Sequence, residues 1–547
     1  MTAGPARAVM VGAGVLGRAD VVAVARRLRP AHLDPGARER MDATRRLVDE
    51  LARSDEPVYG VSTGFGSLAT QPVPAGRRDD LQRSLLRSHA AGMGPAVEDE
   101  VVRAMMLLRA RTLATGHTGA RPEVAELLLA LLDAAITPVV PEFGSLGCSG
   151  DLAPLAHAGL ALVGEGSVIH DGVERPAAEA LAAAGLSPLV LQAKEGLALV
   201  NGTDGMLGML VLACDDLARL VRTADVAAAM SVEALLGTDR PFAADLQALR
   251  PHPGQAASAA NLTAVLAGSA IVASHRMGDP RVQDAYSLRC APQVVGAARD
   301  TLTFAEGVAD RELASAIDNP VVLDDGRVES VGNFHGAPLG FACDFLAIAA
   351  AEVGAIAERR VDRLLDARRS QGLPAFLAAD PGVDSGLMIA QYTAAALVAE
   401  NRRLAAPASV DSLPTSAMQE DHVSMGWAAA RKLRTVLVNL GRIVAIELVA
   451  AGRGLDLRAP LQPAPATAAA LAACGRWWPA LGPTGSWRRS WRPPSAWSPK
   501  GPCWPPSRPS PALCREAAPA PPSGRQTDVN LTAVRRPERP WFRGGRG

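Results

Sequence analysis

The chain has 547 residues, 48% of them hydrophobic, which is enough for one large fold with a generous core or for two to four domains. Lys+Arg and Asp+Glu both total 56, so the charge balance gives no reason to expect a nucleic-acid or anionic-membrane partner. The seven cysteines form no CxxC pair, which argues against a zinc site or a disulfide framework and suits a reducing cytosol.

The N-terminal region carries a GxGxxG pattern at residues 12–17, after a short apolar run. A dinucleotide site needs this turn inside a βαβ unit, with an acidic residue at the end of the second strand. Residues 21–51 instead predict a helix, a proline break and a second helix, so we expect no nucleotide site. No small-residue cleavage pattern and no membrane-length apolar run is found, so neither a signal peptide nor a membrane span is predicted.

From about residue 95 to 475, Ala, Leu and Val dominate and recur at intervals of three and four, which predicts a mainly α-helical protein. The longest such segment, residues 424–455, predicts a helix of about eight turns that packs in a bundle or between subunits. Loops rich in Gly, Pro, Ser and Asp hold most of the unusual polar residues, at 57–78, 141–154, 276–292, 318–336 and 405–425.

The loop PEFGSLGCSGDLAPLAH, residues 141–157, resembles the G-x-S-x-G elbow of serine hydrolases, but Asp151 replaces the last glycine. No strand-rich segment precedes it, so a hydrolase is disfavoured. A purely structural interpretation is a glycine-rich turn in which Ser149 or Asp151 caps the following helix.

The same loop allows a less common chemistry. In a tight bend, which Gly147 and other small residues permit, the amide nitrogen of Gly150 can attack the carbonyl of Cys148. Loss of two waters then leaves a five-membered ring in which Ser149 has become an alkene. The protein would gain an electrophile that no ordinary side chain provides.

The composition changes abruptly after Gly475. Residues 476–547 hold seven of the eight tryptophans, fifteen of the 42 prolines, and thirteen Lys+Arg against three Asp+Glu, a net charge of +10 that leaves −10 on the first 475 residues. This tail shows neither helical nor strand periodicity, and we expect disorder there. A shifted reading frame is the favoured interpretation, and a natural basic tail is the alternative.

GSLGCSGDLAPLAH resembles the prosthetic-group signature of the aromatic amino acid ammonia-lyases. Further motifs follow in the family's order over residues 8–475: YGVSTGFGSLA, LQRSLLRSHAAGMG, LVNGTDGM, RVQDAYSLRCAPQ, VGNFHGAPLG and PASVDSLPTSAMQEDHVSMG. The resemblance implies a long-helix bundle of the fumarase/aspartase-like ammonia-lyase type, with a smaller mixed N-terminal region that carries the prosthetic-group loop. It divides the chain into 1–200, 201–475 and the tail 476–547.

The resemblance also implies the chemistry of the loop. Cys148, Ser149 and Gly150 would form 4-methylideneimidazol-5-one (MIO), with Asp151 assisting the cyclisation and no external cofactor. Tyr59 would be the base that removes the β-hydrogen of the substrate, and its alternative is an ordinary packed tyrosine.

Other positions are implied to bind an amino acid substrate. Arg289 would clamp its carboxylate, because a guanidinium fork matches two oxygens; the alternative is a surface ion pair. The remaining positions are Tyr286, Gln419, Asn201, Gln283 and Phe334. For Asn201 and Gln283 the alternative is a buried amide satisfied by the backbone, and for Phe334 it is core packing. No metal is expected, because the neighbours Glu420, Asp421 and His422 cannot all face one ion.

The residue pair Ser88-His89 and the carboxylate of Glu420 resemble the histidine-specific members of the family. A carboxylate gains a charge-assisted hydrogen bond from an imidazole and would be poorly compensated against a phenyl ring. The expected reaction is therefore deamination of L-histidine to trans-urocanate and ammonia. Alternatives are a tyrosine or phenylalanine lyase, an aminomutase, or a helical scaffold that has lost its chemistry.

The resemblance further implies a cytoplasmic homotetramer whose active sites draw loops from three subunits, with no nucleic-acid or membrane partner. Two departures from the family pattern stand out. Cys148 replaces the commoner alanine and puts a thiol beside the electrophile, and Met418 replaces an asparagine before Gln419.

Overall fold

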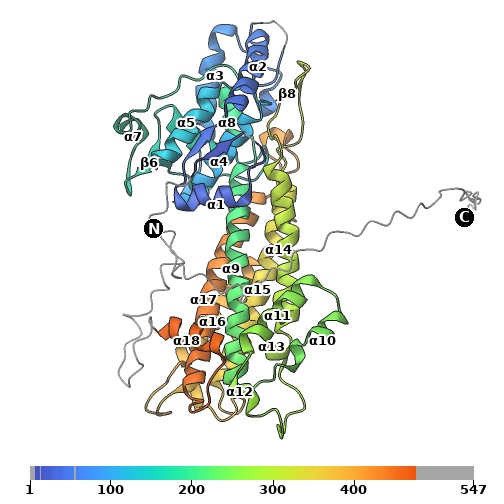
Figure 1. The fold of residues 1–547 in the computed structure, drawn as a ribbon. Helices are drawn as coiled ribbons and strands as arrows, with labels where there is room; N and C mark the ends of the chain where they lie inside the picture. Colours follow the sequence, from blue (N-terminus) through green and yellow to red (C-terminus); the bar gives the residue numbers. More distant parts are fainter. Residues whose placement is uncertain (1–6, 13, 54–56, 476–547) are drawn as a thin grey trace, which may run out of the picture.

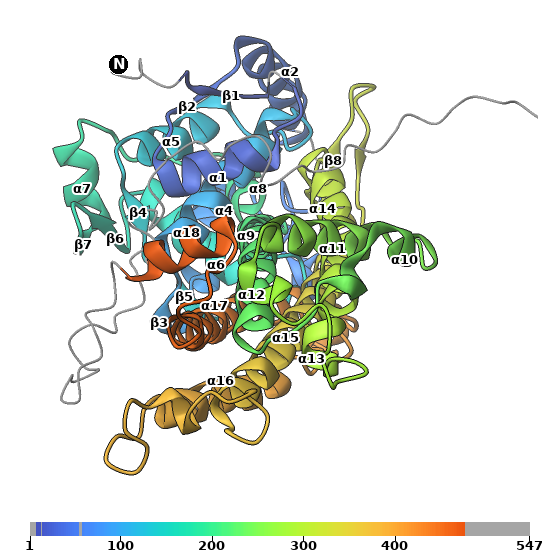
Figure 2. The ribbon, with the colours of Figure 1, turned by 60° about the horizontal axis from the view of Figure 1, so that its bottom comes forward.

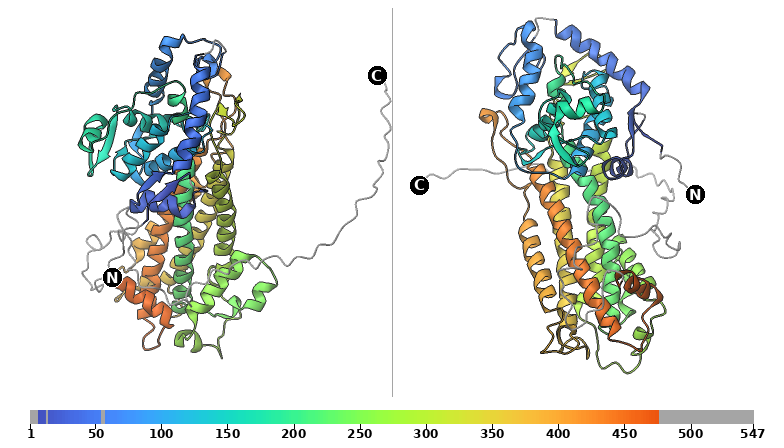
Figure 3. Two further views of the ribbon diagram at one scale, coloured as in Figure 1. Left: turned by 45° about the horizontal axis from the view of Figure 1, so that its top comes forward. Right: turned by 90° about the vertical axis from the view of Figure 1, so that its left-hand side faces the viewer.

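The computed structural model describes residues 7–12, 14–53 and 57–475; the tail expected after Gly475 lies outside the described residues. Figure 1 shows a head of short helices and strands, formed by residues 7–200, at one end of a long helical bundle. The side views in Figure 3 place the head at the same end of the bundle. The mainly helical fold predicted from the sequence is confirmed.

Long helices form the bundle: α9 (Asp204–Ala234), α14 (Ala291–Leu313), α15 (Ala337–Leu365), α16 (Met388–Leu404) and α17 (Gly426–Asp456). Helix α17 confirms the long helix predicted at 424–455, and its expected apolar face, with Leu433, Val436 and Leu440, is buried. Seen from the lower end in Figure 2, α15 lies between α17 and α13, with α16 on the outside. The large buried stripes of α9, α15 and α17 explain why they form the core of the bundle.

Helices α15 and α17 are long and apolar enough to span a membrane by length and composition, but 67% of each such window is buried inside the protein. Packing within the bundle therefore accounts for their apolar sequences. Shorter elements surround the lower end: η3 (Arg240–Phe242), α10 (Ala244–Ala248), α11 (Pro253–Leu266), α12 (Ala270–Ala273), α13 (Tyr286–Arg289), η4 (Ala375–Leu377) and α18 (Pro465–Gly475).

The head combines helices with small sheets. Its helices are α1 (Arg18–Arg27), α2 (Pro35–Leu51), α3 (Arg78–His89), α4 (Asp99–Ala114), α5 (Pro122–Asp133), α6 (Leu152–Leu162), α7 (Ala177–Ala183) and α8 (Glu195–Val200), with η1 (Gly66–Leu68) and η2 (Ala75–Arg77). Its strands are β1 (Val9–Val11), β2 (Ala31–Leu33), β3 (Met93–Ala96), β4 (Thr137–Pro138), β5 (Pro141–Phe143), β6 (Ser167–His170) and β7 (Val173–Pro176). Strand β3 pairs antiparallel with β5, and β4, β6 and β7 form an antiparallel sheet. The short hairpin β8 (Val321–Val322) and β9 (Val328–Glu329) joins the bundle to this region.

The expectation of two helices separated only by a proline break at residues 21–51 was wrong. Residues 31–33 form β2, which pairs in parallel with β1, so β1, α1 and β2 make a small βαβ unit. Its glycine turn packs against α2, since a Cβ on Gly12 would lie 2.5 Å from Cβ of Ala37. Asp34, the acidic residue after β2, is used as the N-cap of α2, where it accepts from the backbone N–H of Gly36 and Ala37.

Buried ion pairs attach the head to the bundle. Arg26 of α1 donates to Glu100 of α4 (2.8 Å) and Asp216 of α9 (2.7 Å), and Arg434 of α17 also donates to Asp216 (2.9 Å). The pKa of Asp216 stays below its usual value despite burial, because the charges of Arg26 and Arg434 favour the carboxylate. One continuous apolar core runs from the head into the bundle around these charges.

Candidate active site

The loop of residues 144–151 joins β5 to α6 and is bent around two glycines with left-handed backbone. Gly147 has φ 71° and Gly150 has φ 82°. A Cβ at Gly150 would lie 2.0 Å from the carbonyl oxygen of Gly202, and one at Gly147 would lie 2.2 Å from Oγ of Ser424. Only glycine fits at both positions, so the loop bends sharply on either side of Cys148 and Ser149.

The three-residue strand β5 precedes this loop, contrary to the expectation that no strand would. The presence of β5 does not make a serine hydrolase a better interpretation. Within the described residues, Ser149 has no hydrogen bond to a histidine, and His157 of α6 accepts at Nε2 from the backbone N–H of Gly92 (3.1 Å). A serine nucleophile would have no base here.

Asp151 occupies the N-cap position of α6, as predicted, but its side chain does not cap that helix. It is fully buried, and its Oδ2 accepts from the backbone N–H groups of Gly205 and Met206 (both 2.9 Å) in the first turn of α9, while Oδ1 accepts from Ser145 (3.1 Å). The cap therefore joins the loop to the bundle. Local sequence pointed to the nearer helix because it carries no information about this tertiary contact.

Burial, opposed by the donors from Met206, Ser145 and Gly205 and assisted by the charge of Asp204, raises the pKa of Asp151 from 3.8 to about 7. A raised folded-state pKa means that the protonated carboxyl stabilises the fold. This contribution is complete below about pH 4 and is lost as the pH rises through about 7.

We expect an Asp151→Asn variant, whose amide does not titrate, to show a flatter fall of melting temperature between pH 4 and pH 7 than the unmodified chain. Thermal unfolding monitored by circular dichroism across this range measures the difference. Asp171→Asn is the matched control, because Asp171 is exposed in the β6–β7 turn. Parallel curves for the unmodified chain and Asp151→Asn would contradict the assignment.

Tyr59 lies in the loop between α2 and η1, half-buried against the ring of Phe65. Its hydroxyl oxygen accepts from the backbone N–H of Gly66 (3.0 Å). Burial raises the pKa of Tyr59, the Gly66 N–H lowers it, and the negative charge of Glu420 raises it further. In one chain, therefore, the phenol stays protonated at neutral pH.

Glu420 is held by its own loop. Thr415 donates from Oγ1 to Oε2 of Glu420 at 2.6 Å, and the backbones of the two residues form a two-bond bridge. Ser416, in η5 (Ser416–Met418), accepts at Oγ from the N–H of Ser67, which joins this loop to the Tyr59 loop. Thr415 and Ser416 were not predicted, although both lie in the motif PASVDSLPTSAMQEDHVSMG. Their hydrogen bonds to Glu420 and Ser67 depend on the folded structure and cannot be read from the sequence motif.

His89 is the last residue of α3, and it lies close enough to Glu420 for the carboxylate to affect the pKa of its imidazole. Burial lowers the pKa of His89, partly offset by a hydrogen bond to the backbone of Leu85 and by the charge of Glu420, so the imidazole is neutral at pH 7. The hydroxyl of Ser88 lies 3.0 Å from the Leu85 carbonyl oxygen and 3.0 Å from Nδ1 of His89. The neutral imidazole has one donor and one acceptor nitrogen.

Cys148 also faces Glu420. Burial, followed by the charge of Glu420, raises the pKa of the Cys148 thiol to about 11. Little thiolate exists at neutral pH, so the sensitivity to oxidation suggested by its place beside an electrophile is weak.

Three further predicted residues, Phe334, Gln419 and Asn201, lie at this end of the bundle. Phe334, half-buried, precedes α15, and the neighbouring His335 ring stacks on His422 with centroids 5.6 Å apart. Gln419 is exposed beside Glu420. Asn201 is buried and follows α8, where Gly202 forms a parallel bridge with Gly150. The structure thus brings most of the predicted residues to the head end of the bundle.

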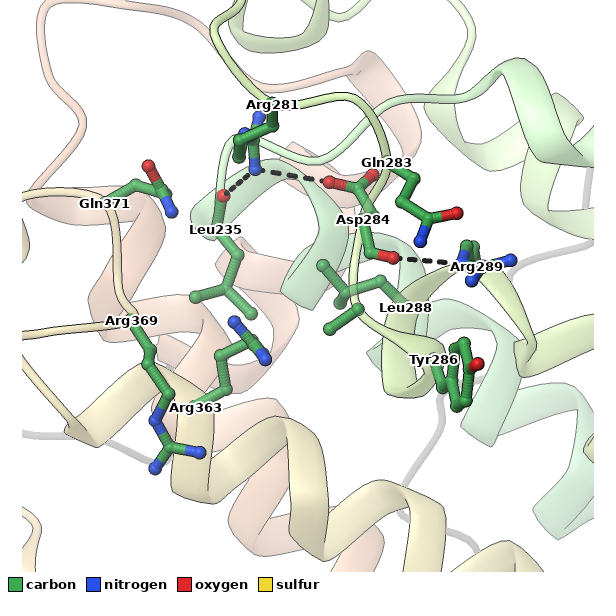
Figure 4. A pocket seen from close by; sticks show the side chains of 11 residues that line it. Leu235, Arg281, Gln283, Asp284, Tyr286, Leu288, Arg289, Arg363, Arg369 and Gln371 are labelled. Atoms are coloured by element: carbon green, nitrogen blue, oxygen red, sulfur yellow. Dashed lines mark hydrogen bonds and ion pairs between the residues drawn. The ribbon is translucent and has the colours of Figure 1, made fainter.

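Gln283, Tyr286 and Arg289 do not join them. They line a pocket of about 420 Å³ at the opposite end of the bundle, together with Arg281, Arg363 and Arg369 (Figure 4). Arg289 lies over the Tyr286 ring, 4.6 Å from its centroid, and donates from Nε to the carbonyl of Asp284. Within the described residues its Nη atoms donate to no other group, so that edge is available to a carboxylate.

Helix α9 gives the separation of the two groups. Its first turn donates to Asp151, and Arg281 donates to the carbonyl of Leu235 just after its last residue, Ala234. At 1.5 Å per residue, 31 residues place the two ends about 45 Å apart. A single chain therefore does not bring the two groups of residues together.

Residues 16–476 match the family model for aromatic amino acid lyase. The chain belongs to this family. A curated histidine ammonia-lyase of Streptomyces avermitilis is 64% identical over 466 residues, 85% of this chain and 91% of that protein. The match to the family model ends at residue 476, where the composition of the chain changes.

Solved structures of the family show the same fold. The tyrosine aminomutase of Streptomyces globisporus is 38% identical with a TM-score of 0.84, over 88% of this chain and 95% of that chain. A histidine ammonia-lyase of Trypanosoma cruzi is 39% identical with a TM-score of 0.79, over 86% and 89%. The helical bundle expected from the aromatic amino acid lyase motifs is confirmed.

Proposed function

We propose that this chain is a histidine ammonia-lyase that converts L-histidine to trans-urocanate and ammonia in the cytoplasm, the first step of histidine degradation. One observation supports histidine above all: the Glu420 carboxylate is held within electrostatic reach of His89, Tyr59 and the Ser149 loop. A half-buried carboxylate such as Glu420 gains a charge-assisted hydrogen bond from an imidazole. Opposite a phenyl ring it would remain uncompensated.

The residues around the Ser149 loop fit a MIO group. Left-handed glycines at 147 and 150 allow the bend, and among the described residues the buried Oδ1 of Asn201, beside the loop, has no hydrogen-bond partner. Once formed from Cys148, Ser149 and Gly150, MIO supplies an electrophilic alkene that turns the substrate amine into a leaving group. Asp151 fixes the end of the loop on α9.

The side chains have separate tasks around the substrate. The acceptor nitrogen of neutral His89 can accept from an imidazole N–H of the substrate, and the Glu420 carboxylate can accept the second N–H of a protonated ring. Tyr59 is placed to remove the β-hydrogen, but it must first lose its proton, which its raised pKa opposes. Positive charge from another part of the protein is therefore needed to lower the pKa of Tyr59.

The arginine pocket at the far end of the bundle is the natural source of that charge. Because about 45 Å separate the two groups of residues in one chain, we place Gln283, Tyr286 and Arg289 of one copy against Tyr59 of another, in a homotetramer. Arg289 then binds the substrate carboxylate and the surrounding arginines lower the pKa of Tyr59. A lone chain would be inactive.

Incubation of the purified chain with L-histidine, L-tyrosine and L-phenylalanine, followed by absorbance of the conjugated acid and by chromatography of β-amino acids, tests the proposal. We expect urocanate from histidine alone. Cinnamate-type products or a β-amino acid would assign the chain to another activity of the family, such as that of the tyrosine aminomutases it resembles. No turnover of any substrate would favour the inactive scaffold.

We expect Glu420→Gln to lower kcat for histidine by about 10²-fold, because an amide can neither carry negative charge toward the imidazole nor replace the carboxylate as an acceptor at both oxygens. Steady-state kinetics measures the effect. Asp421→Asn, the same change in the exposed next residue, is the control. Equal rates in the Glu420→Gln and unmodified chains would remove the main argument for histidine.

A further inference from the structure

Asn201 contacts a buried ion pair, Lys194–Asp318, to which the proposed reaction assigns no role. Nζ of Lys194 donates to Oδ2 of Asp318 at 2.6 Å, and the two side chains are 0% and 1% exposed. Lys194 starts α8 with φ 70°, a left-handed conformation that is unusual for lysine. The chain has three lysines among its 56 basic residues, so lysine rather than arginine at this position is notable.

The ion pair determines which way the Asn201 amide faces. Nδ2 of Asn201 lies 3.3 Å from Oδ1 of Asp318 and 2.7 Å from the carbonyl oxygen of Asn319. Both neighbours are acceptors, so only the NH₂ group of the amide can face them. Asp318 is itself fixed, because its Oδ1 also accepts from the backbone N–H of Asn319 (2.8 Å).

The other end of the amide is left for a ligand. Oδ1 of Asn201 is buried and has no hydrogen-bond partner among the described residues. The backbone is held as well, since the buried guanidinium of Arg109 donates to the carbonyls of Asn201 and Ile317 (both 2.9 Å). Gly202 bridges to Gly150, which places Asn201 alongside Ser149.

A buried acceptor without a partner is costly unless a donor arrives. Beside Ser149, the donor that the proposed reaction brings is the amine of the amino acid. If Asp318 were absent, the amide could rotate and present its NH₂ to that amine, which would repel a cation. Lys194 in turn neutralises Asp318, which would otherwise be a buried carboxylate without a counter-charge.

We propose that Lys194 and Asp318 are positioning residues that lock the Asn201 amide with Oδ1 toward the substrate amine. This inference rests on the proposed function, because the ligand it names is the amine of an amino acid substrate. The pair acts through Asn201 and touches no substrate atom. Its effect is therefore specific to ligands that carry an amine.

Asp318→Asn tests the inference, because it keeps the shape but offers an NH₂ that can compete with that of Asn201. Calorimetry measures binding of L-histidinol, which has the amine, and of 3-(imidazol-4-yl)propanoate, which lacks it. We expect histidinol binding to weaken by about 10-fold, the loss of one charge-assisted hydrogen bond, and propanoate binding to stay unchanged. We also expect kcat for histidine to fall by about 10-fold or more.

Asp225→Asn is the matched control, since Asp225 is an equally buried aspartate paired with Arg299 at 2.7 Å, between α9 and α14. It should change neither affinity. If Asp318→Asn weakens both ligands equally, or neither, the positioning role is refuted. Should that variant fail to fold, Lys194→Met, which removes the positive charge that neutralises Asp318, gives the same comparison. Absence of histidine turnover in the unmodified chain would instead refute the proposed function.

Discussion

Replacing Ser149 with alanine is expected to reduce histidine deamination by about 10³-fold or more while leaving the fold intact. The hydroxyl of Ser149 must leave as water to create the alkene, and alanine has nothing to lose. Ser149 is only partly buried and makes no hydrogen bond to another side chain among the described residues, so its removal disturbs little packing.

Two measurements separate the loss of chemistry from the loss of structure. The mass of a fragment spanning residues 141–157 should fall short by two waters in the unmodified chain and match the plain sequence in Ser149→Ala. Ser167→Ala, the same change at an exposed position of β6, should retain both the mass deficit and the activity. Urocanate formation by Ser149→Ala at an undiminished rate would overturn the assignment.

The features of the fold that sequence predicted are those encoded by strong local patterns. The 3.6-residue period of α17 is sustained for 31 residues, so its position was predicted within about two residues. The strands β1 and β2 have three residues each, too few to show an alternating pattern, and β2 was therefore taken for a break between helices.

The residues of the candidate site also fall into those that the sequence predicted and those that it did not. Motif resemblance identified the residues that we expect to contact substrate, but not the residues that hydrogen-bond to them: Thr415 to Glu420, and Asp318, paired with Lys194, to Asn201. The contacts of Asp318 with Lys194 and Asn201 join segments more than 100 residues apart and leave no periodic trace in the sequence. The rarity of lysine in this chain was the one available signal for Lys194.

The roles assigned to the individual site residues remain predictions, as do the domain limits near residues 200 and 475. The frame-shift interpretation of residues 476–547 also remains a prediction, since those residues lie outside the described structure. Translation of the gene in the other frames beyond codon 475 tests it: resumed Ala- and Leu-rich helical periodicity would support it.

The second large effect is expected in the bundle, at the ion pair between Arg360 of α15 and Glu447 of α17. Both side chains are 0% exposed; Nη2 of Arg360 donates to Oε2 of Glu447 at 2.9 Å, and Ser231 of α9 donates to Oε1 at 2.8 Å. Three core helices thus meet at one buried carboxylate. Arg360 also donates from Nη1 to the carbonyl of Ser287 in α13 (3.1 Å), so it supports the Arg289 pocket.

Arg360→Met is expected to destabilise the protein by about 3–5 kcal/mol, because it leaves Glu447 buried without a counter-charge. The double variant Arg360→Met/Glu447→Leu should recover much of this loss, since no charge is then stranded in the core. Urea unfolding measures both, with Arg403→Met in the exposed Arg403–Glu400 pair as a control that should change nothing measurable. The double variant should still bind the substrate carboxylate less well than the unmodified chain, because the Ser287 carbonyl has lost its donor. A double variant as unstable as Arg360→Met would show that packing around the arginine, rather than charge, holds α9, α15 and α17 together.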